Sequence, residues 1–356
     1  MVITNLATNN LETRGYAVLE AKEPLEPYIF KRRALGESDV AFDVSYSGIC
    51  HSDIHQAREE WGSAIFPMVP GHEIVGIVTE VGSSVTKFAV GEKIGVGVFV
   101  DSCRVCENCL AGQQQYCLDG MTGTYNGYER DGKTVALGGY SNKFVINQDY
   151  AVKIPDSLDF AAVAPLLCAG ITLYSPLRHW KIGSGSKVGV MGLGGLGHMG
   201  VKFAAAMGAE VTVFSHSASK EADARRFGAA HFVVTKNPAV LEPLKDSFDL
   251  ILNTISAELD INQYLELLKL HGTLVIIGLP GEPYSVDAGS LLTLRRSLAG
   301  SMIGGIPEIQ EMLDFCAEKN IVSDIELIKA DYINEAYDRT VASDVKYRFV
   351  IDASTF

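Results

Sequence analysis

The chain is short of positive charge. Its 356 residues include 30 Lys and Arg against 43 Asp and Glu, which gives a formal net charge of −13. A surface dominated by negative charge repels phosphate polymers and anionic lipid. The composition therefore argues against nucleic acid and membrane surfaces as main partners, and any phosphate site must be local.

Long apolar runs and export signals are also missing. The longest uncharged stretch, residues 160–177, contains Pro165, Gly170 and Pro176, which is typical of a globular core with a turn and not of a membrane helix. Met1–Tyr16 has neither a basic flank nor an apolar segment, so we expect no signal peptide and a cytoplasmic protein. With 47% hydrophobic residues, a chain of this length is expected to form two domains with substantial cores.

Four of the seven cysteines are closely spaced as C-x2-C-x2-C-x7-C: Cys103, Cys106, Cys109 and Cys117. Four thiolates in a short polar loop suit a tetrahedral zinc ion. Disulfides would need an oxidising compartment, and the comparable iron–sulfur motif ends in C-x3-C-P, whereas here the fourth Cys is further away and precedes Leu118. The spacing favours a structural zinc held by a loop over residues 101–118.

Cys50, His72 and Cys168 form a second, more dispersed group. Two thiolates, one imidazole and an open fourth position make a catalytic zinc site in some enzymes. Each residue also has an ordinary interpretation, because Cys is often buried in cores and a lone His often only satisfies a hydrogen bond. The residues by themselves leave both hypotheses open.

Hydrophobic patterns divide the chain into two parts. Short apolar alternations broken by glycines predict a small all-β barrel over residues 18–97. In the second half, strand-like runs alternate with helices, which predicts a parallel sheet with right-handed crossovers. We predict one domain of residues 1–157 and 307–356, and a second domain of residues 158–306; the motifs below indicate a catalytic zinc domain and a dinucleotide-binding domain, respectively. The strand-like runs of the second domain are Lys187–Met191, Glu210–Phe214, His231–Val234, Leu250–Asn253 and Thr273–Ile277.

A glycine-rich turn follows the first of these runs. Gly192, Gly194 and Gly197 fit G-x-G-x-x-G between a strand and a helix, the context of a dinucleotide-binding turn. Gly192 permits the tight turn, Gly194 lets the backbone approach a pyrophosphate, and Gly197 allows close packing of helix on strand. A glycine turn in a protein core is the ordinary alternative. We expect the whole turn, including Gly195 and Leu196, to bind the cofactor through backbone N–H groups.

The end of the second strand indicates which dinucleotide binds. NAD sites usually carry Asp or Glu there, whereas this chain has Ser215, His216 and Lys220. Hydroxyls and an ammonium group suit a 2′-phosphate, so we expect NADP(H) in preference to NAD(H). The alternative is that Ser215 and Ser217 only cap the next helix.

Together these segments resemble the zinc-dependent medium-chain alcohol dehydrogenases, and most closely their cinnamyl alcohol dehydrogenase branch with its broad-specificity NADPH aldehyde reductases. The likeness covers essentially the whole chain. It rests on the four-cysteine loop, on Trp61 and on the segments Gly48–His55, Pro67–Glu73, Leu166–Pro176 and Gly300–Gly305. It implies an α/β fold with a GroES-like β-barrel catalytic domain and a Rossmann doubly wound parallel sheet. It also implies a C2 homodimer joined through an edge strand over Ser297–Ile303.

The resemblance assigns roles around the catalytic zinc. Cys50, His72 and Cys168 are implied as ligands of one of two Zn²⁺ ions per subunit. Glu73 is implied beside the metal and Asp53 as the carboxylate that orients the ligand His. Ser52 and His55 are implied as the path of the proton to water. The alternative for His55 is an ordinary surface histidine.

The resemblance also extends the cofactor and substrate sites. Thr172, Ile277 and Ser301 are implied as further cofactor contacts. His216 departs from the Arg that NADPH-specific relatives often carry, so the preference for NADP(H) is expected to be incomplete. Trp61 is expected to line an apolar substrate pocket, with a place in the barrel core as the alternative.

The predicted function is that of an NADP-dependent zinc alcohol dehydrogenase or aldehyde reductase. It would transfer hydride between NADP(H) and aromatic or medium-chain primary alcohols and aldehydes such as cinnamaldehyde. A polyol or sugar dehydrogenase of the same superfamily is one alternative, which the apolar Trp61 and Phe66 disfavour. A non-enzymatic NADPH- and zinc-binding sensor is the other, which the intact ligand trio with Ser52 and His55 disfavours.

Overall fold

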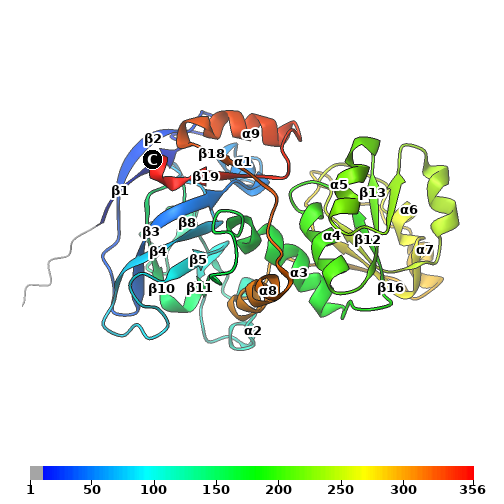
Figure 1. The fold of residues 1–356 in the computed structure, drawn as a ribbon, viewed down its shortest axis with the longest axis horizontal. Coiled ribbons are helices and arrows are strands. Elements are labelled where there is room, and N and C mark those ends of the chain that lie inside the picture. The colour runs from blue at the N-terminus through cyan, green and yellow to red at the C-terminus, as the bar shows by residue number, and fades with distance from the viewer. Residues whose placement is uncertain (1–10) are drawn as a thin grey trace, which may run out of the picture. The chain divides into compact units, whose positions relative to one another are not determined.

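The computed structural model of the chain describes residues 11–356, so part of the expectation for Met1–Tyr16 lies outside the described residues. The chain forms two units: unit 1 runs to Cys168 and resumes at Gly305, and unit 2 is Ala169–Gly304 (Figure 1). The sequence analysis set the first boundary after residue 157. Residues 158–168 lie in unit 1, because the short helix η3 (Ala164–Leu167) is buried against strands of its sheet.

Unit 1 is built mainly from strands. They are β1 (Leu11–Ala17), β2 (Glu26–Arg32), β3 (Asp39–Gly48), β4 (Ile74–Val81), β5 (Lys93–Val96), β6 (Phe99–Asp101), β7 (Thr122–Gly123), β8 (Gly127–Tyr128), β9 (Val135–Ala136), β10 (Lys143–Asn147), β11 (Val152–Lys153), β18 (Ile325–Ile328) and β19 (Arg348–Asp352). Its helices are α1 (His51–Ala57), α2 (Glu107–Leu110), α8 (Ile306–Lys319) and α9 (Ile333–Val341).

The main sheet of unit 1 joins distant parts of the chain. Its order is β11-β5-β4-β3-β19-β18, and β10 also pairs with β3. β19 lies antiparallel to β3, with Val350 opposite Gly48, so the last 50 or so residues complete a sheet that the first half begins. Gly48, the last residue of β3, is thereby paired with β19 just before the chain enters α1.

Helix α1 is a departure from the all-β pattern predicted over residues 18–97. It has seven residues, too few for a helical period to stand out among short strands. Asp53 at its third position stabilises the first turn, because Oδ2 accepts a hydrogen bond from the backbone N–H of Cys50 at 2.9 Å. This helix carries the residues expected to form the proton path.

Unit 2 is an alternation of strands and helices. Its elements are α3 (Ala169–His179), β12 (Lys187–Met191), α4 (Gly197–Ala206), β13 (Glu210–Ser215), α5 (Glu221–Arg226), β14 (His231–Val234), β15 (Phe248–Asn253), α6 (Asn262–Leu265), β16 (Leu268–Ile276), α7 (Ala288–Leu292) and β17 (Ser297–Gly300). The strands form one parallel sheet in the order β14-β13-β12-β15-β16-β17. This order reverses beside β12, which is the topology of a doubly wound sheet. The edge strand predicted over 297–303 ends at Gly300.

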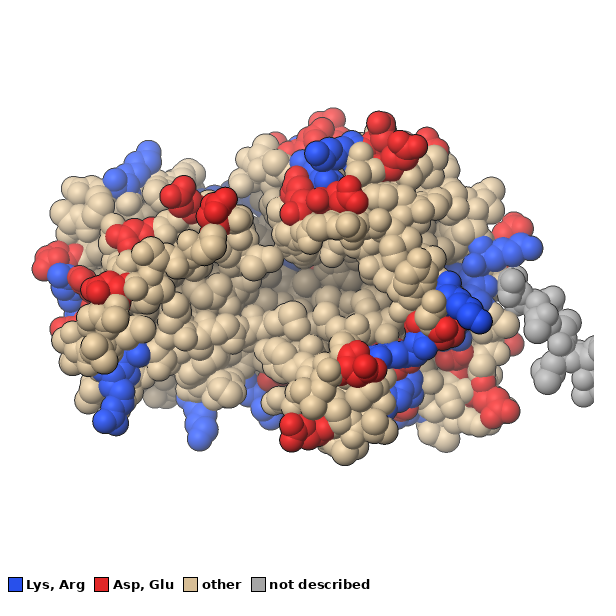
Figure 2. All heavy atoms as spheres, turned by 180° about the vertical axis from the view of Figure 1, so that it is seen from behind, with Lys and Arg blue, Asp and Glu red and all other residues tan. Residues whose placement is uncertain are grey.

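Burial explains why the strands of unit 2 are so apolar. Val188, Val190 and Met191 of β12 have no exposed surface, as expected for a parallel sheet covered by helices on both faces. Figure 2 shows that, on the face it draws, acidic and basic side chains are interspersed among uncharged ones. No helix within residues 11–356 is long and apolar enough to span a membrane.

Candidate active site and cofactor site

One buried carboxylate connects two of the predicted zinc ligands. Asp53, which caps α1 next to Cys50, also accepts through Oδ1 from the N–H of Gly71 at 3.1 Å and from Nδ1 of His72 at 3.0 Å. Because an ionised carboxylate can only accept, Nδ1 of His72 donates to Asp53, and in the neutral ring the lone pair is on Nε2. The ring of Tyr125 stacks on the imidazole, with centroids 5.8 Å apart.

The structure brings Cys50, His72, Glu73 and Cys168 together. Their ligand atoms all lie within 4.8 Å of one another, and all four residues are buried. The two Sγ atoms are 4.0 Å apart, close to the separation of about 3.8 Å that two thiolates have on a tetrahedral zinc. Nε2 of His72 and Oε2 of Glu73 are buried without a hydrogen-bond partner among residues 11–356. A buried nitrogen and a buried carboxylate oxygen that lack hydrogen-bond partners, next to two thiols, are suitable ligands for a zinc ion.

The electrostatics of this group favour a cation. The hydrogen bond with Cys168 holds the pKa of Cys50 well below its ordinary value, against the opposing effect of burial. The thiolate is the form that binds metal. Burial raises the pKa of Glu73 to about 8, although Arg348, whose Nη2 lies 2.5 Å from Oε1, acts in the opposite direction. A Cβ on Gly48 would lie 2.0 Å from Oε2 of Glu73, so a larger residue at position 48 would displace this carboxylate.

The four-cysteine loop forms a second group. The Sγ atoms of Cys103, Cys106, Cys109 and Cys117 also lie within 4.8 Å of one another, and no disulfide joins cysteines within residues 11–356. Backbone N–H groups point at the sulfurs, as from Cys103 to Cys117 and from Cys106 to Cys103, both at 3.3 Å. Such donors stabilise thiolates, so this loop fits a second zinc.

The predicted proton path lies on one face of α1. Ser52 Oγ is 3.6 Å from Sγ of Cys50, and Ser52 and His55 are three positions apart, so they share a helix face. His55 stacks on Trp61, with ring centroids 4.7 Å apart, and Nδ1 of His55 lies 2.5 Å from Oε2 of Glu60. Trp61 is 44% exposed, which excludes a place in the barrel core.

Glu60 and Arg348 are site residues that the sequence analysis missed. Glu60 reaches His55 because the chain folds back after α1, where the N–H of Glu60 bonds the carbonyl of His55 at 2.9 Å. Arg348 lies 275 positions from Glu73. Neither spacing belongs to a repeating pattern, so no local signal marked these residues.

The glycine turn of unit 2 has the geometry expected of a cofactor turn. Gly192 has φ of +86°, and a Cβ on Gly197 would lie 2.1 Å from the Gly192 carbonyl oxygen, so both need glycine. A Cβ on Gly194 would meet no atom of the described residues within 4 Å. The turn therefore presents open backbone at the start of α4, which suits a pyrophosphate.

The residues after β13 meet this turn. Nζ of Lys220 donates to the carbonyl of Leu193 at 2.9 Å, which joins the two segments predicted to bind the cofactor. Ser215 is buried, and its Oγ accepts from the N–H of Ser217 at 3.2 Å. Ser217 caps the short helix η4 (Ala218–Lys220), as the capping alternative expected, and His216 is exposed.

The other predicted cofactor contacts lie on unit 2 as well. Ile277 follows β16 and Ser301 follows β17, and the N–H of Ser301 bonds the carbonyl of Ile276 at 3.2 Å. Both therefore lie at the carboxyl edge of the parallel sheet, the edge at which the turn after β12 also lies. Thr172 is on α3, which packs on α4.

Comparisons with known proteins identify both units. Residues 36–156 match the alcohol dehydrogenase GroES-like domain, and residues 195–318 match the zinc-binding dehydrogenase domain. The chain is 60% identical to NADP-dependent alcohol dehydrogenase C 1 of Mycolicibacterium smegmatis, over 96% of this chain and 98% of the relative. It is 51% identical to the aldehyde reductase YahK of Escherichia coli, over 97% and 99% of the two chains.

A solved structure agrees with these relatives. The cinnamyl alcohol dehydrogenase SbCAD4 of Sorghum bicolor superposes with a TM-score of 0.94 at 44% identity, over 97% of this chain and 98% of that one. The predicted α/β fold, with a GroES-like domain and a Rossmann sheet, is thereby confirmed. The resemblance inferred from the motifs is confirmed too: the chain belongs to the zinc-dependent medium-chain alcohol dehydrogenases, in their cinnamyl alcohol dehydrogenase branch.

Proposed function

We propose that this protein is an NADP-dependent zinc alcohol dehydrogenase that works as an aldehyde reductase. The observation that carries the proposal is the buried group of Cys50, His72 and Cys168, in which Nε2 of His72 has no partner within residues 11–356. A merely structural histidine would have both ring nitrogens satisfied. The relatives named as alcohol dehydrogenases and aldehyde reductases support the same reaction and do not favour polyols or a sensor.

Residues of unit 1 would hold the zinc ion that activates the substrate. When bound, zinc supplies Lewis acidity toward the substrate oxygen, and NADPH supplies the hydride. Cys50, His72 and Cys168 hold the metal, and two thiolates offset its charge. Asp53 keeps the proton of His72 on Nδ1, so that Nε2 remains a ligand atom.

Proton delivery falls to α1. Ser52 lies beside the metal ligand Cys50, and His55 follows one helical turn later on the same face. Glu60 accepts from Nδ1 of His55, which fixes the ring and leaves Nε2 to exchange the proton. The side chain of His55 is partly exposed, so the path ends at water.

The substrate and cofactor preferences follow from the side chains at each site. Trp61 offers a large apolar face beside His55, which suits aromatic or medium-chain aldehydes such as cinnamaldehyde. Ser215 at the end of β13 and Lys220 five residues later suit the 2′-phosphate of NADP(H), whereas the exposed His216 stands where NADPH-specific relatives often carry Arg. NADP(H) is therefore preferred, with some use of NAD(H).

A homodimer formed through β17 is part of the proposal. β17 is at one end of the sheet order of unit 2, and an edge strand with apolar surroundings invites pairing. Leu279 and Leu292, 61% and 81% exposed, provide apolar surface in the same unit. Gly300→Pro would remove a backbone donor from the outer side of this edge, because the N–H of the next residue, Ser301, points inward to the carbonyl of Ile276 and N–H groups alternate along a strand. We expect that variant to sediment as a monomer while the unchanged chain sediments as a dimer.

The deciding experiment is the initial rate of NADPH oxidation by zinc-replete protein with cinnamaldehyde and with benzaldehyde. NADH is run in parallel, and Cys168→Ala serves as the matched inactive control. Fast turnover with NADPH and slow turnover with NADH is expected. Absence of turnover with either cofactor, in protein that contains two zinc ions per chain, would reject the proposal.

A further inference from the structure

A chain of two tyrosine hydroxyls leads from the C-terminal part of unit 1 to the Asp53 carboxylate behind the metal site. We propose that Tyr140, supported by Tyr337, is a positioning residue for the active-site metal: its hydroxyl holds Asp53 in the orientation that makes His72 a ligand. The inference rests on the proposed function, because it assumes that His72 binds zinc.

The hydrogen bonds of Asp53 carry the argument. Oδ2 accepts from the N–H of Cys50 at 2.9 Å and from the hydroxyl of Tyr140 at 3.1 Å. Oδ1 accepts from the N–H of Gly71 and from Nδ1 of His72. A carboxylate has about four acceptor sites, so these four donors can use all of them and define its rotation. Asp53 has no exposed surface, so bulk water does not reach it to replace a lost donor.

Tyr140 is the one side-chain hydroxyl among these four donors. The other groups are two backbone N–H groups, fixed by α1 and by the turn at Gly71, and the imidazole itself. Without the Tyr140 hydroxyl, Oδ2 would lose one of the two donors that lie within 3.1 Å of it, and the carboxylate could tilt away from His72 even though the hydroxyl of Tyr125 also interacts with Asp53. The tilt would weaken the bond that selects the Nδ1–H tautomer.

The segment that carries Tyr140 is bound directly to the segment that carries His72. The N–H groups of Gly138, Gly139 and Tyr140 donate to the carbonyls of Val69, Gly71 and Pro70 at 2.7 to 2.9 Å. Gly71 has φ of +103°, and a Cβ on it would lie 2.6 Å from Cδ1 of the Tyr140 ring. The ring therefore occupies space that only glycine leaves, immediately before the metal ligand.

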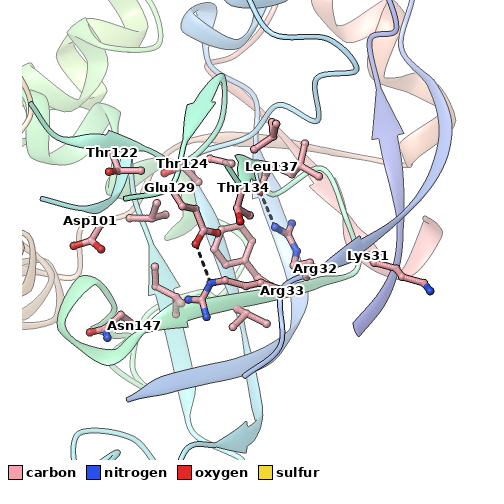
Figure 3. A pocket seen from close by; sticks show the side chains of 16 residues that line it. Lys31, Arg32, Arg33, Asp101, Thr122, Thr124, Glu129, Thr134, Leu137 and Asn147 are labelled. Atoms are coloured by element: carbon pink, nitrogen blue, oxygen red, sulfur yellow. Dashed lines mark hydrogen bonds and ion pairs between the residues drawn. The ribbon is translucent and has the colours of Figure 1, made fainter. Parts of the chain in front are cut away.

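A buried arginine fixes both flanks of Tyr140. Arg32, at the end of β2, donates to the carbonyls of Leu137 and Gly138 at 2.7 and 2.6 Å. On the other side it donates to Oγ of Ser141 at 2.8 Å and to the carbonyl of Lys143 at 2.6 Å. Figure 3 shows Arg32 directed toward Leu137 at the wall of a pocket, while Arg33 beside it pairs with Glu129. Such bracing is expected of a segment whose side chain must not move.

Tyr337 on α9 supports the hydroxyl of Tyr140. The two hydroxyl oxygens are 3.4 Å apart, and the rings meet edge to face with centroids 6.4 Å apart. Because Tyr337 donates to Tyr140, the proton of Tyr140 is directed to Asp53. The contact is long for a hydrogen bond between hydroxyls, so we expect a smaller effect from Tyr337 than from Tyr140.

The test is the rate at which zinc-loaded, full-length protein loses each zinc to a colorimetric chelator. Cys168→Ala, which lacks the active-site metal, identifies the phase that belongs to the four-cysteine site. We expect Tyr140→Phe to release the active-site zinc about 10-fold faster or more, with the other phase unchanged. Tyr337→Phe should give a smaller increase, and none in the Tyr140→Phe background, because it acts through that hydroxyl.

A spectroscopic readout separates positioning from general loosening. Cobalt in place of the active-site zinc should show shifted ligand-field bands in Tyr140→Phe. The matched control is Tyr264→Phe, which removes a buried phenol hydroxyl in unit 2, and it should change neither the bands nor either phase.

Three outcomes would overturn the inference. One is a release rate for the active-site metal within twofold of the unchanged protein, and another is equal acceleration of both phases. If Tyr140→Phe does not fold, Tyr337→Phe decides, and an unchanged rate in that variant rejects the inference. An unchanged protein that binds a single zinc per chain would instead reject the proposed function, which keeps the two failures distinct.

Discussion

The buried ion pair between Arg348 and Glu73 allows a quantitative test of the site. The two side chains are 5% and 0% exposed, and Nη2 of Arg348 lies 2.5 Å from Oε1 of Glu73. Arg348 also donates through Nε and Nη2 to the carbonyl of Ile49, at 3.2 and 2.8 Å. Arg348→Met keeps much of the side-chain volume and removes the charge and all of these hydrogen bonds.

The expected loss follows from the burial of both partners. Above the Glu73 pKa of about 8, where the carboxyl is ionised, removing one member of this buried pair costs about 3–5 kcal/mol, because the other charge stays buried without compensation. The lost bonds to Ile49 add about 1 kcal/mol. Arg348→Met combined with Glu73→Gln removes both charges, so it should lose at least about 2 kcal/mol less than Arg348→Met alone.

The loss should also depend on pH. Burial raises the pKa of Glu73 to about 8, and Arg348 opposes that rise, so its removal moves the pKa higher still. A carboxyl whose pKa is higher in the folded than in the unfolded state makes stability fall as pH rises between the two values. Arg348→Met should therefore be less destabilised well below the pKa of about 8 than above it.

The assay is urea unfolding of zinc-loaded protein followed by tryptophan fluorescence. The chain has two Trp, and Trp180 belongs to unit 2, so a Trp180→Phe background leaves Trp61 as the reporter of unit 1. A loss below about 1 kcal/mol would refute the argument that this charge pair is desolvated and coupled. So would a double variant no more stable than Arg348→Met.

Three further predictions concern the metals, the cofactor and one surface turn. Cys168→Ala should lose one zinc per subunit and the activity while the fold is retained, whereas Cys103→Ser should lower the midpoint of thermal unfolding. Zinc analysis checks the first expectation and calorimetry the second. Full activity of Cys168→Ala would contradict the ligand assignment. Lys220→Ala should weaken NADPH binding by about 10-fold or more, the value of one charge-assisted hydrogen bond. Fluorescence titration should show little change for NADH, and an equal loss for both cofactors would contradict a role at the 2′-phosphate. Hydrogen bonds from Thr134 and the backbone lower the pKa of Asp131 to about 2. The ionised Asp131 therefore stabilises the folded state above the ordinary pKa of a carboxyl, and this contribution is lost as the pH falls toward 2. Thr134→Val should raise the pKa of Asp131 in an NMR titration, and an unchanged pKa would contradict the stated cause.

Local features of the sequence predicted much of the fold. The predicted runs Lys187–Met191 and His231–Val234 coincide with β12 and β14, because short apolar runs that alternate with helices mark the strands of a parallel sheet. The glycine turn was recognisable since strand, turn and helix follow one another directly. The four cysteines were recognisable because they lie within one short loop. These patterns need only neighbours in the chain.

Other features could not be predicted from the sequence, because they depend on residues that are distant along the chain. Helix α1 is short, and its capping carboxylate could be placed only once His72 and Tyr140 were seen to converge on it. The boundary predicted after residue 157 missed η3, which belongs to unit 1 because of the strands it is buried against. The roles of the individual site residues stay predictions until variants are measured.

The sequence by itself determined the chemistry available: thiols and imidazoles for metal, open glycine backbone for a pyrophosphate, and a serine and a lysine at or after the end of the second strand of unit 2, where NAD sites usually carry Asp or Glu, for a 2′-phosphate. Tertiary structure decided which groups meet. Cys50 and Cys168 are 118 positions apart, and Arg348 reaches Glu73 because β19 pairs with β3 in one particular register. Register shifted by one residue would turn Arg348 to the other face of the sheet, and only the packing of the whole unit excludes that shift.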